Sequence, residues 1–149
     1  MTWPDSANPT ATPPTSAIQN TARVLLGSAM IFAGIGHLTF ARQDFRAQVP
    51  ASLPFGEDFV VLASGVVEIA LGGALTWWPR SRAQLGWLLG GFFVAVFPGN
   101  VSQYLKRDGR LNLDTDRRRG VRLLFQPLLV LWALWSTGAL AMWEPGRGK

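Results

Sequence analysis

The chain has 149 residues, of which 48% are hydrophobic and 15% charged, and its 14 basic and 9 acidic side chains give a net charge of +5. Soluble domains average about 25% charged residues, so this composition leaves too little polar surface for a water-facing protein. The absence of cysteine excludes disulfides, thiolate metal sites and iron–sulfur clusters, and the single histidine, His37, excludes a site that needs two imidazoles. The composition therefore indicates an integral membrane protein with one domain.

Residues 1–21 contain four prolines, many small polar side chains and almost no charge. Such a segment cannot bury enough apolar surface to offset the entropy cost of ordering it. We expect a disordered Pro-rich tail over 1–21, a membrane domain over 22–144 and a short tail over 145–149.

Four long apolar segments follow the tail, over residues 24–41, 59–78, 85–101 and 123–143. At 1.5 Å per residue each helix would span roughly 25–32 Å, which matches a hydrocarbon core about 30 Å thick. The predicted fold is all-α: a transmembrane bundle of four helices.

The distribution of basic residues predicts the orientation of this bundle. Four spans would place both termini on one side, with five basic residues, against nine in or beside the 42–58 and 102–122 loops. The positive-inside rule then puts both loops in the cytoplasm, and the protein in a bacterial cytoplasmic membrane. The three arginines at 117–119 suggest phosphoinositide or nucleic-acid binding, but an anchor beside anionic lipid is the favoured interpretation, with no nucleic-acid partner.

The 42–58 loop is more than a plain linker. Apolar residues recur between its charges, and two prolines interrupt any long helix. It is compatible with a short helix lying in the membrane interface or with a lid over a site in the bundle, and the sequence does not separate the two.

Each predicted span carries one strong hydrogen-bonding side chain: His37, Glu68, Asn100 and Gln126, with Arg122 one turn before the last of these. An ionisable group in hydrocarbon costs about 2.5–3.5 kcal/mol, so these groups should face the bundle interior. Glu68 is expected near the midplane, and the others around the cytoplasmic half. The helical rise places His37 about 8 Å shallower than Glu68, so that direct contact would need helix tilt or a bridging water.

Two interpretations of these polar residues remain open. In the first they form a binding or proton-relay site, and in the second they fix helix packing through hydrogen bonds worth about 0.6 kcal/mol each. Packing is favoured for Asn100 and Gln126, and function is favoured for Glu68. For His37 the two interpretations are equally supported.

Two prolines, Pro98 and Pro127, lie beside polar residues near the ends of their spans, and each removes a backbone donor. Membrane helices tolerate this where protein or water satisfies the freed carbonyls, so the prolines favour a hydrated pocket at this level. The sequence contains no phosphate-binding glycine loop and no nucleophile triad, and one histidine with one glutamate is a poor metal set. We therefore expect no catalytic residue and no metal, and a non-catalytic subunit in preference to an independent enzyme.

Five short motifs occur in order along the chain: AGIGHL (33–38), VPASLP (49–54), SGVVEIALG (64–72), FPGN (97–100) and LLFQP (123–127). Together they resemble the DoxX family and its DoxX-like relatives, small four-span bacterial membrane proteins, over about residues 22–138. The resemblance implies an accessory subunit of a membrane redox or stress-response system, as in thiosulfate–quinone oxidoreduction or complexes with superoxide dismutase and a sulfurtransferase. It implies no catalytic residue set.

The resulting hypothesis is a membrane subunit that binds a quinone or a lipid in its cytoplasmic half. Glu68 and His37 would bond quinone carbonyls or relay protons, while Asn100, Gln126 and Arg122 would shape the mouth of the site. The expected partners are the bilayer, and a redox enzyme or a second copy of the chain. The alternatives are a small transport protein with Glu68 as its coupling site and a scaffold without a ligand.

Overall fold

The computed structural model describes residues 14–107 and 115–143, and every regular element in these two segments is a helix. The elements are α1 (Ala17–Leu38), α2 (Arg42–Arg46), α3 (Glu57–Trp77), the 3-10 helix η1 (Pro79–Ser81), α4 (Arg82–Lys106), α5 (Asp116–Ser136) and the 3-10 helix η3 (Ala139–Trp143). The all-helical prediction is confirmed.

Helix α1 begins inside the stretch that the sequence assigns to a tail. Ser16 is its N-cap: the Ser16 hydroxyl accepts from the Gln19 backbone N–H at 3.2 Å, and the Gln19 side chain accepts from the Ser16 N–H at 2.9 Å. This reciprocal capping box satisfies two backbone donors that would otherwise have no partner, which starts the helix at Ala17. The remainder of the predicted tail, residues 1–13, and the predicted short tail at 145–149 lie outside the described residues.

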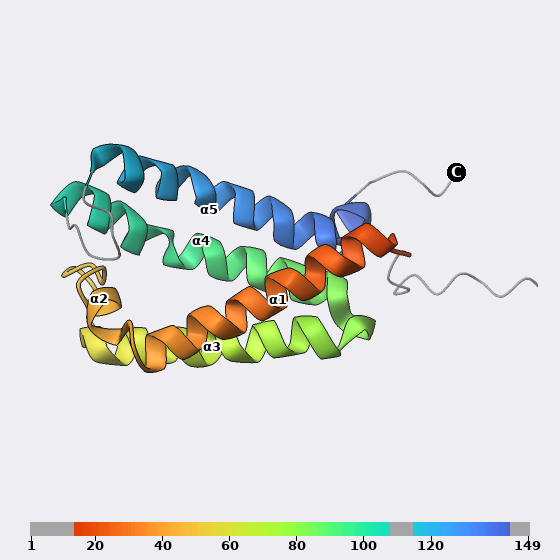
Figure 1. Cartoon of the computed structure of the whole chain (residues 1–149), viewed down its shortest axis with the longest axis horizontal. Helices are drawn as coiled ribbons and strands as arrows, with labels where there is room; N and C mark the ends of the chain where they lie inside the picture. Colours follow the sequence, from red (N-terminus) through yellow and green to blue (C-terminus); the bar gives the residue numbers. More distant parts are fainter. Residues whose placement is uncertain (1–13, 108–114, 144–149) are drawn as a thin grey trace, which may run out of the picture.

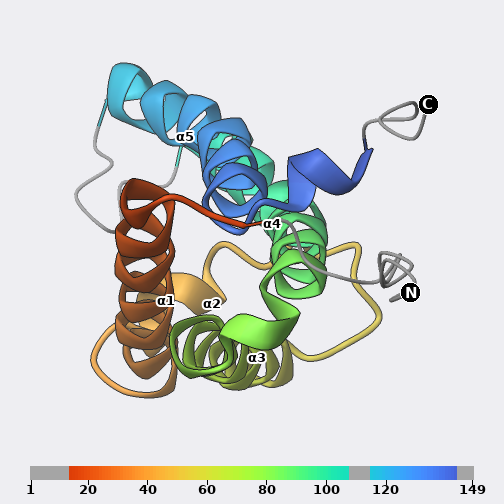
Figure 2. The same ribbon diagram turned by 90° about the vertical axis from the view of Figure 1, so that its right-hand side faces the viewer.

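The four long helices form two antiparallel pairs, α1 with α3 and α4 with α5 (Figure 1). The view along the bundle shows the two pairs as separate layers, with α2 at the far end (Figure 2). Contacts between the pairs are sparser than contacts within them, so the space between the layers is the natural place for a cavity.

Glycines bring α1 and α3 into close contact. A Cβ atom added at Gly34 would lie 2.6 Å from the carbonyl oxygen of Gly65, and one added at Gly72 would lie 2.6 Å from that of Gly27. Backbone atoms cannot move aside as a flexible side chain can, so only glycine fits these positions. Small residues at a helix interface allow this spacing in membrane proteins, where packing rather than the hydrophobic effect holds helices together.

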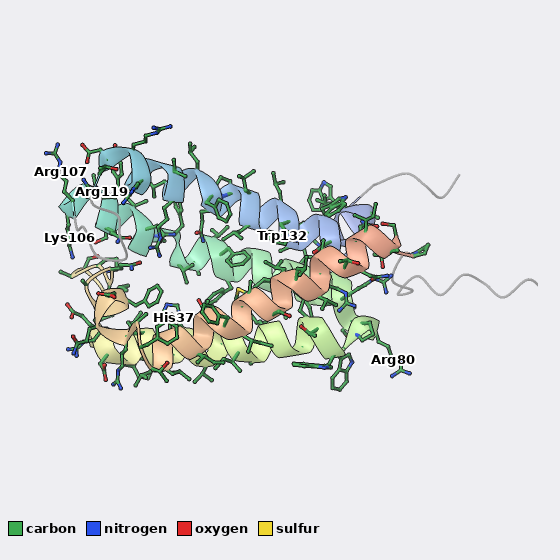
Figure 3. The ribbon with its side chains drawn as sticks, viewed as in Figure 1. His37, Arg80, Lys106, Arg107, Arg119 and Trp132 are labelled. Atoms are coloured by element: carbon green, nitrogen blue, oxygen red, sulfur yellow. The ribbon has the colours of Figure 1, made fainter. Side chains whose placement is uncertain are left out.

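The two pairs close on each other in the half of the bundle that contains the start of α1 and the end of α5. The buried apolar cluster lies here and consists of Leu26, Met30, Leu75, Leu89, Phe93 and Ala133. Two hydrogen bonds also join α1 to α5: the Gln19 Nε2 donates to the Trp135 carbonyl at 2.8 Å, and the Trp132 Nε1 donates to the Ala22 carbonyl at 3.0 Å (Figure 3). Among the described residues, no buried apolar cluster of this kind lies in the half nearer α2.

Large apolar side chains also face outward along the long helices; Phe32 is 68% exposed and Val94 is 62% exposed. Three helical segments are long and apolar enough to cross a membrane: Ala17–Leu38, Glu57–Trp77 and Pro79–Lys106. Exposed apolar faces on helices of this length are expected where the solvent is lipid.

The prediction of a fourth span over 123–143 is wrong. Helix α5 begins at Asp116, so its first two turns carry an acidic residue and four arginines, and it ends at Ser136. Gly138, with a positive φ of 73°, then turns the chain into η3. The apolar part of the helix is therefore only residues 123–136, about 21 Å long at 1.5 Å per residue, shorter than a hydrocarbon core.

Helix α2, the end of α4 and the start of α5 lie at the same end of the bundle (Figure 1). Lys106, Arg107 and Arg119 gather at the end that carries α2, whereas Arg80 lies at the opposite end (Figure 3). Trp77, Trp78 and Trp143 are exposed at that opposite end. The two ends thus differ in character, one rich in basic side chains and the other in indole rings.

Candidate functional site

The first pair of predicted polar residues is in direct contact. The Nδ1 atom of His37, near the end of α1, lies 2.6 Å from the Oε2 atom of Glu68 in the middle of α3. Each residue is only 8% exposed. A hydrogen bond of this length between an imidazole and a carboxyl group satisfies two ionisable side chains that would otherwise be costly to bury.

The expectation of an 8 Å offset in depth between His37 and Glu68 was wrong. It assumed that the apolar spans end level with each other, whereas α3 starts at Glu57 and extends beyond the end of α1. In the packed pair the Cβ built at Gly34 would lie 3.1 Å from the Glu68 Cβ, so Glu68 is level with Gly34. Gly34 precedes His37 by one turn, about 4.5 Å, a distance that the two side chains span.

The 42–58 loop packs onto this pair. The Phe45 ring in α2 lies against the His37 ring, with 3.6 Å between centroids. Val49 and Gln48, just after α2, are each 6% exposed. The hydrogen bond to Glu68 occupies Nδ1 of His37, so Nε2 is the ring nitrogen left for a ligand. Of the two alternatives for this loop, the contacts favour the lid.

A second polar cluster joins α4, α5 and the loop. The Arg122 Nε donates to the Asn100 Oδ1 at 3.2 Å, and its terminal nitrogen donates to the Gln48 Oε1 at 3.0 Å. The Asn100 Nδ2 in turn donates to the Gln126 Oε1 at 2.8 Å, and the Gln126 Nε2 donates to the Phe93 carbonyl at 2.6 Å. Each side chain in this network holds the next in one orientation.

Both polar clusters line one cavity of about 600 Å³ between the helix pairs. All five predicted site residues are in its wall: His37, Glu68, Asn100, Arg122 and Gln126. The rest of the wall is mainly apolar and comes from α1, α3, α4, α5 and the loop. The structure thus brings the predicted residues together, while what they bind stays a prediction.

The prolines differ in their relation to this cavity. Pro98 lines it and, as an internal proline of α4, removes the backbone donor that would pair with the Val94 carbonyl. The Phe93 carbonyl, one residue earlier, accepts from the Gln126 side chain at 2.6 Å. Pro127 is exposed and is not in the wall.

The sequence did not point to Gln48, and it marked Phe45 only as one of the recurring apolar residues of the 42–58 loop. Both lie in this loop, where no helical periodicity separates inward from outward positions. The apolar residues that recur in this loop were the one available signal, and they indicated burial without showing which polar neighbour would be buried with them.

The described residues contain no group of three or more His, Cys, Asp or Glu side chains that could hold a metal ion. The buried His37–Glu68 pair supplies two such ligands at most, which is too few for a structural metal site. The chemistry that this arrangement can perform is hydrogen bonding and proton exchange at a lipophilic cavity.

Comparison with protein families identifies the chain. The sequence model of the family described as "Domain of unknown function (DUF8561)" matches residues 26–137, about three quarters of the chain. The chain belongs to this family. Every residue of the cavity wall, from Leu26 to Leu129, falls inside the DUF8561 match. No curated protein and no solved structure matches the chain.

The DUF8561 match overturns the resemblance to the DoxX family. The five motifs consist largely of glycine, proline and apolar residues, and four of them contain one strong hydrogen-bonding side chain each: His37, Glu68, Asn100 and Gln126. In the structure the glycines at 34, 65 and 72 pack α1 against α3, a requirement that any close pair of membrane helices can share. Glycine motifs of this kind reflect helix packing and are not specific to one family.

Proposed function

We propose that this DUF8561 protein is a membrane-embedded binding protein for a lipophilic ligand, a quinone or a lipid, held between its two helix pairs. The observation that carries the proposal is the cavity of about 600 Å³, with mainly apolar walls and two ordered polar clusters. Ligand sites typically enclose about 300–1,000 Å³ and combine apolar walls with a few placed polar groups.

The polar clusters suit a ligand with a polar head and an apolar body. His37 and Glu68 share one hydrogen bond in the wall formed by α1 and α3. Asn100, Gln126 and Arg122 form the wall on the side of α4 and α5. A quinone would accept hydrogen bonds through its carbonyl oxygens, and a lipid through its head group.

We also propose that the protein lies in a bacterial cytoplasmic membrane with the α2 end in the cytoplasm. The support is the gathering of basic residues at this end, which includes Lys106, Arg107 and Arg119 (Figure 3). Because the chain has no cysteine, single substitutions can report the side of each loop. In intact cells a membrane-impermeant maleimide should label Ser81→Cys and leave Ser52→Cys unlabelled; the reverse pattern would contradict the orientation.

The role as an accessory subunit of a redox system rested on the DoxX resemblance, which the DUF8561 match overturns, and it stays an untested prediction. A protein partner and a second copy of the chain remain predictions. The proposal is therefore limited to what the cavity can do, which is to bind a lipophilic molecule.

The test is mass spectrometry of organic extracts from gently purified protein. Ala33 lines the cavity, so Ala33→Leu should partly fill it, whereas Ala70 on α3 is exposed and outside the wall and provides the matched control Ala70→Leu. A defined lipophilic compound should co-purify with the wild type and Ala70→Leu, and be depleted at least several-fold in Ala33→Leu. Equal bilayer lipid in all three proteins would contradict the proposal.

A further inference from the structure

Within the part of the chain that the structure describes, the cavity contains a cation, Arg122, without an anionic partner. Arg122 donates to two neutral amide oxygens, those of Asn100 and Gln48. Among the acidic side chains that the structure describes, none pairs with it, and the one carboxyl in the cavity wall, Glu68, is bonded to His37. Burial lowers the pKa of the Arg122 guanidinium from its ordinary value, but an arginine stays protonated in proteins.

The amide groups around Arg122 are oriented so that donors remain available and acceptors do not. The side-chain oxygens of Gln48, Asn100 and Gln126 all accept hydrogen bonds within the network. Gln48 is only 6% exposed, and its Nε2 atom has no hydrogen-bond partner. An unsatisfied buried donor costs about 1–3 kcal/mol, so a group that fits here should accept hydrogen bonds.

A basic surface hollow adjoins the cavity. Arg122 and Phe125 line both the cavity and a neighbouring surface hollow on the first turns of α5. Arg117 and Arg118 line the same hollow. Clustered positive charge beside an opening attracts anions and raises their local concentration.

The far side of the cavity is suited to a hydrocarbon chain. The wall leads away from Arg122 toward side chains of the closed apolar core, among them Leu26, Met30 and Phe93. Burial of methylene groups there is worth about 0.8 kcal/mol for each group, which gives the tail most of the affinity and leaves selectivity to the head.

We infer that the ligand is an anionic amphipath, whose carboxylate or phosphate head binds Arg122 and Gln48 while its hydrocarbon chain lies between the helix pairs. This inference rests on the proposed function and narrows it, because a neutral quinone would leave the cation uncompensated. Buried charges in proteins are paired, and a carboxylate or phosphate is the partner that a guanidinium binds best.

The test compares three probes that share one chain and differ in the head group: oleic acid, oleyl phosphate and oleyl alcohol. Each is added to the purified full chain in a neutral detergent, and the bound fraction is measured by native mass spectrometry. Wild-type protein should bind one or both acids at least about tenfold more tightly than the alcohol, the effect expected from one charge-assisted hydrogen bond. The acid that binds more tightly identifies the preferred head group.

Variants then assign the preference to Arg122. Arg122→Gln should lower acid binding to the level of the alcohol, Arg122→Lys should retain a preference for the acids, and Arg80→Gln, at the opposite end of the bundle, should match the wild type. Equal binding of the acids and the alcohol to wild type, lost in Ala33→Leu, would overturn this inference and leave the proposed function standing. If no probe bound to the wild type or to Ala33→Leu, the result would count against both the inference and the proposed function.

Discussion

Nδ1 of His37 and Oε2 of Glu68 lie 2.6 Å apart in the wall of a cavity between two helix pairs. The contact joins the end of α1 to the middle of α3, and the close glycine packing of these helices sets its register. Because both residues are buried, the hydrogen bond between them offsets part of the free-energy cost of removing each side chain from solvent.

The His37–Glu68 contact predicts strong coupling between the two side chains. Each single substitution, His37→Ala or Glu68→Ala, should lower the free energy of unfolding by up to about 3–5 kcal/mol, because it leaves a buried ionisable group without its partner. The double variant should be more stable than the sum of the single effects predicts, by about 1–3 kcal/mol. The measurement is tryptophan fluorescence during titration with SDS in mixed micelles.

A second cycle provides the control for this coupling. Glu68 and Asn100 line the same cavity but belong to different hydrogen-bonded clusters. Glu68→Ala and Asn100→Ala should therefore be additive to within about 0.5 kcal/mol. If the effects of His37→Ala and Glu68→Ala also simply added, the contact would have no energetic role.

The glycine contacts predict that α1 and α3 cannot accept a methyl group at their interface. Gly34→Ala would place a Cβ 2.6 Å from the Gly65 carbonyl oxygen, so the helices must separate. Overpacking of this kind costs about 1–3 kcal/mol in the free energy of unfolding. Gly91→Ala on α4 is the matched control, since no atom lies within 4 Å of the added Cβ. Similar stability of the two variants in the SDS titration would refute the account of this interface.

The capping box at the start of α1 predicts a local effect. Ser16→Ala removes the hydroxyl that accepts from the Gln19 N–H, at an expected cost of about 0.5–2 kcal/mol. Hydrogen exchange of the backbone amides at 17–21 should speed up by about one order of magnitude, while amides near Gly65 keep their rates. Ile18→Val, at a 73% exposed position in the first turn with no side-chain hydrogen-bonding group, serves as the control and should leave exchange unchanged. Unaltered exchange in Ser16→Ala would show that the cap does not determine where the helix begins.

The start of α5 should be sensitive to acid. The Arg119 guanidinium donates to Asp116 at 2.6 Å and lowers the pKa of that carboxyl below its usual value of 3.8. The stabilisation is therefore complete above pH 3.8 and disappears as the pH falls through the lower pKa of the folded protein. Exchange of the first amides of α5 should accelerate on acidification in the wild type, relative to the intrinsic rate. Asp116→Asn should remove that dependence, and a variant that retained it would point to another titrating group.

The sequence predicts the helices well where apolar composition and helix ends coincide. The 59–78 prediction matches Glu57–Trp77 closely, because charged residues and a tryptophan pair mark both ends of this segment. The prediction of a helix over 123–143 fails, because an apolar run does not reveal that α5 already starts at Asp116 or that the chain turns at Gly138. Helix boundaries depend on caps and turns, and the apolar content of a window contains no information about them.

For the candidate site, the sequence predicted which residues take part but not how they are arranged. The cost of burying polar groups in lipid identified five residues that line one cavity, including His37 and Glu68. Their mutual geometry was not accessible, because the register between two antiparallel helices is set by packing and not by depth from the span ends. Gln48 was missed because it lies in a loop, where tertiary contacts alone decide which side chain is buried.

The most direct measurement is a crystal structure of the protein grown in a lipidic mesophase after purification without delipidation. The account predicts continuous elongated electron density between the helix pairs, with its polar end within hydrogen-bonding distance of Arg122 or His37 and its apolar end toward Leu26. Density of this kind in the wild type, and its loss in Ala33→Leu, would establish the cavity as a ligand site. A cavity collapsed by neighbouring side chains, or occupied by water alone, would contradict the central claim.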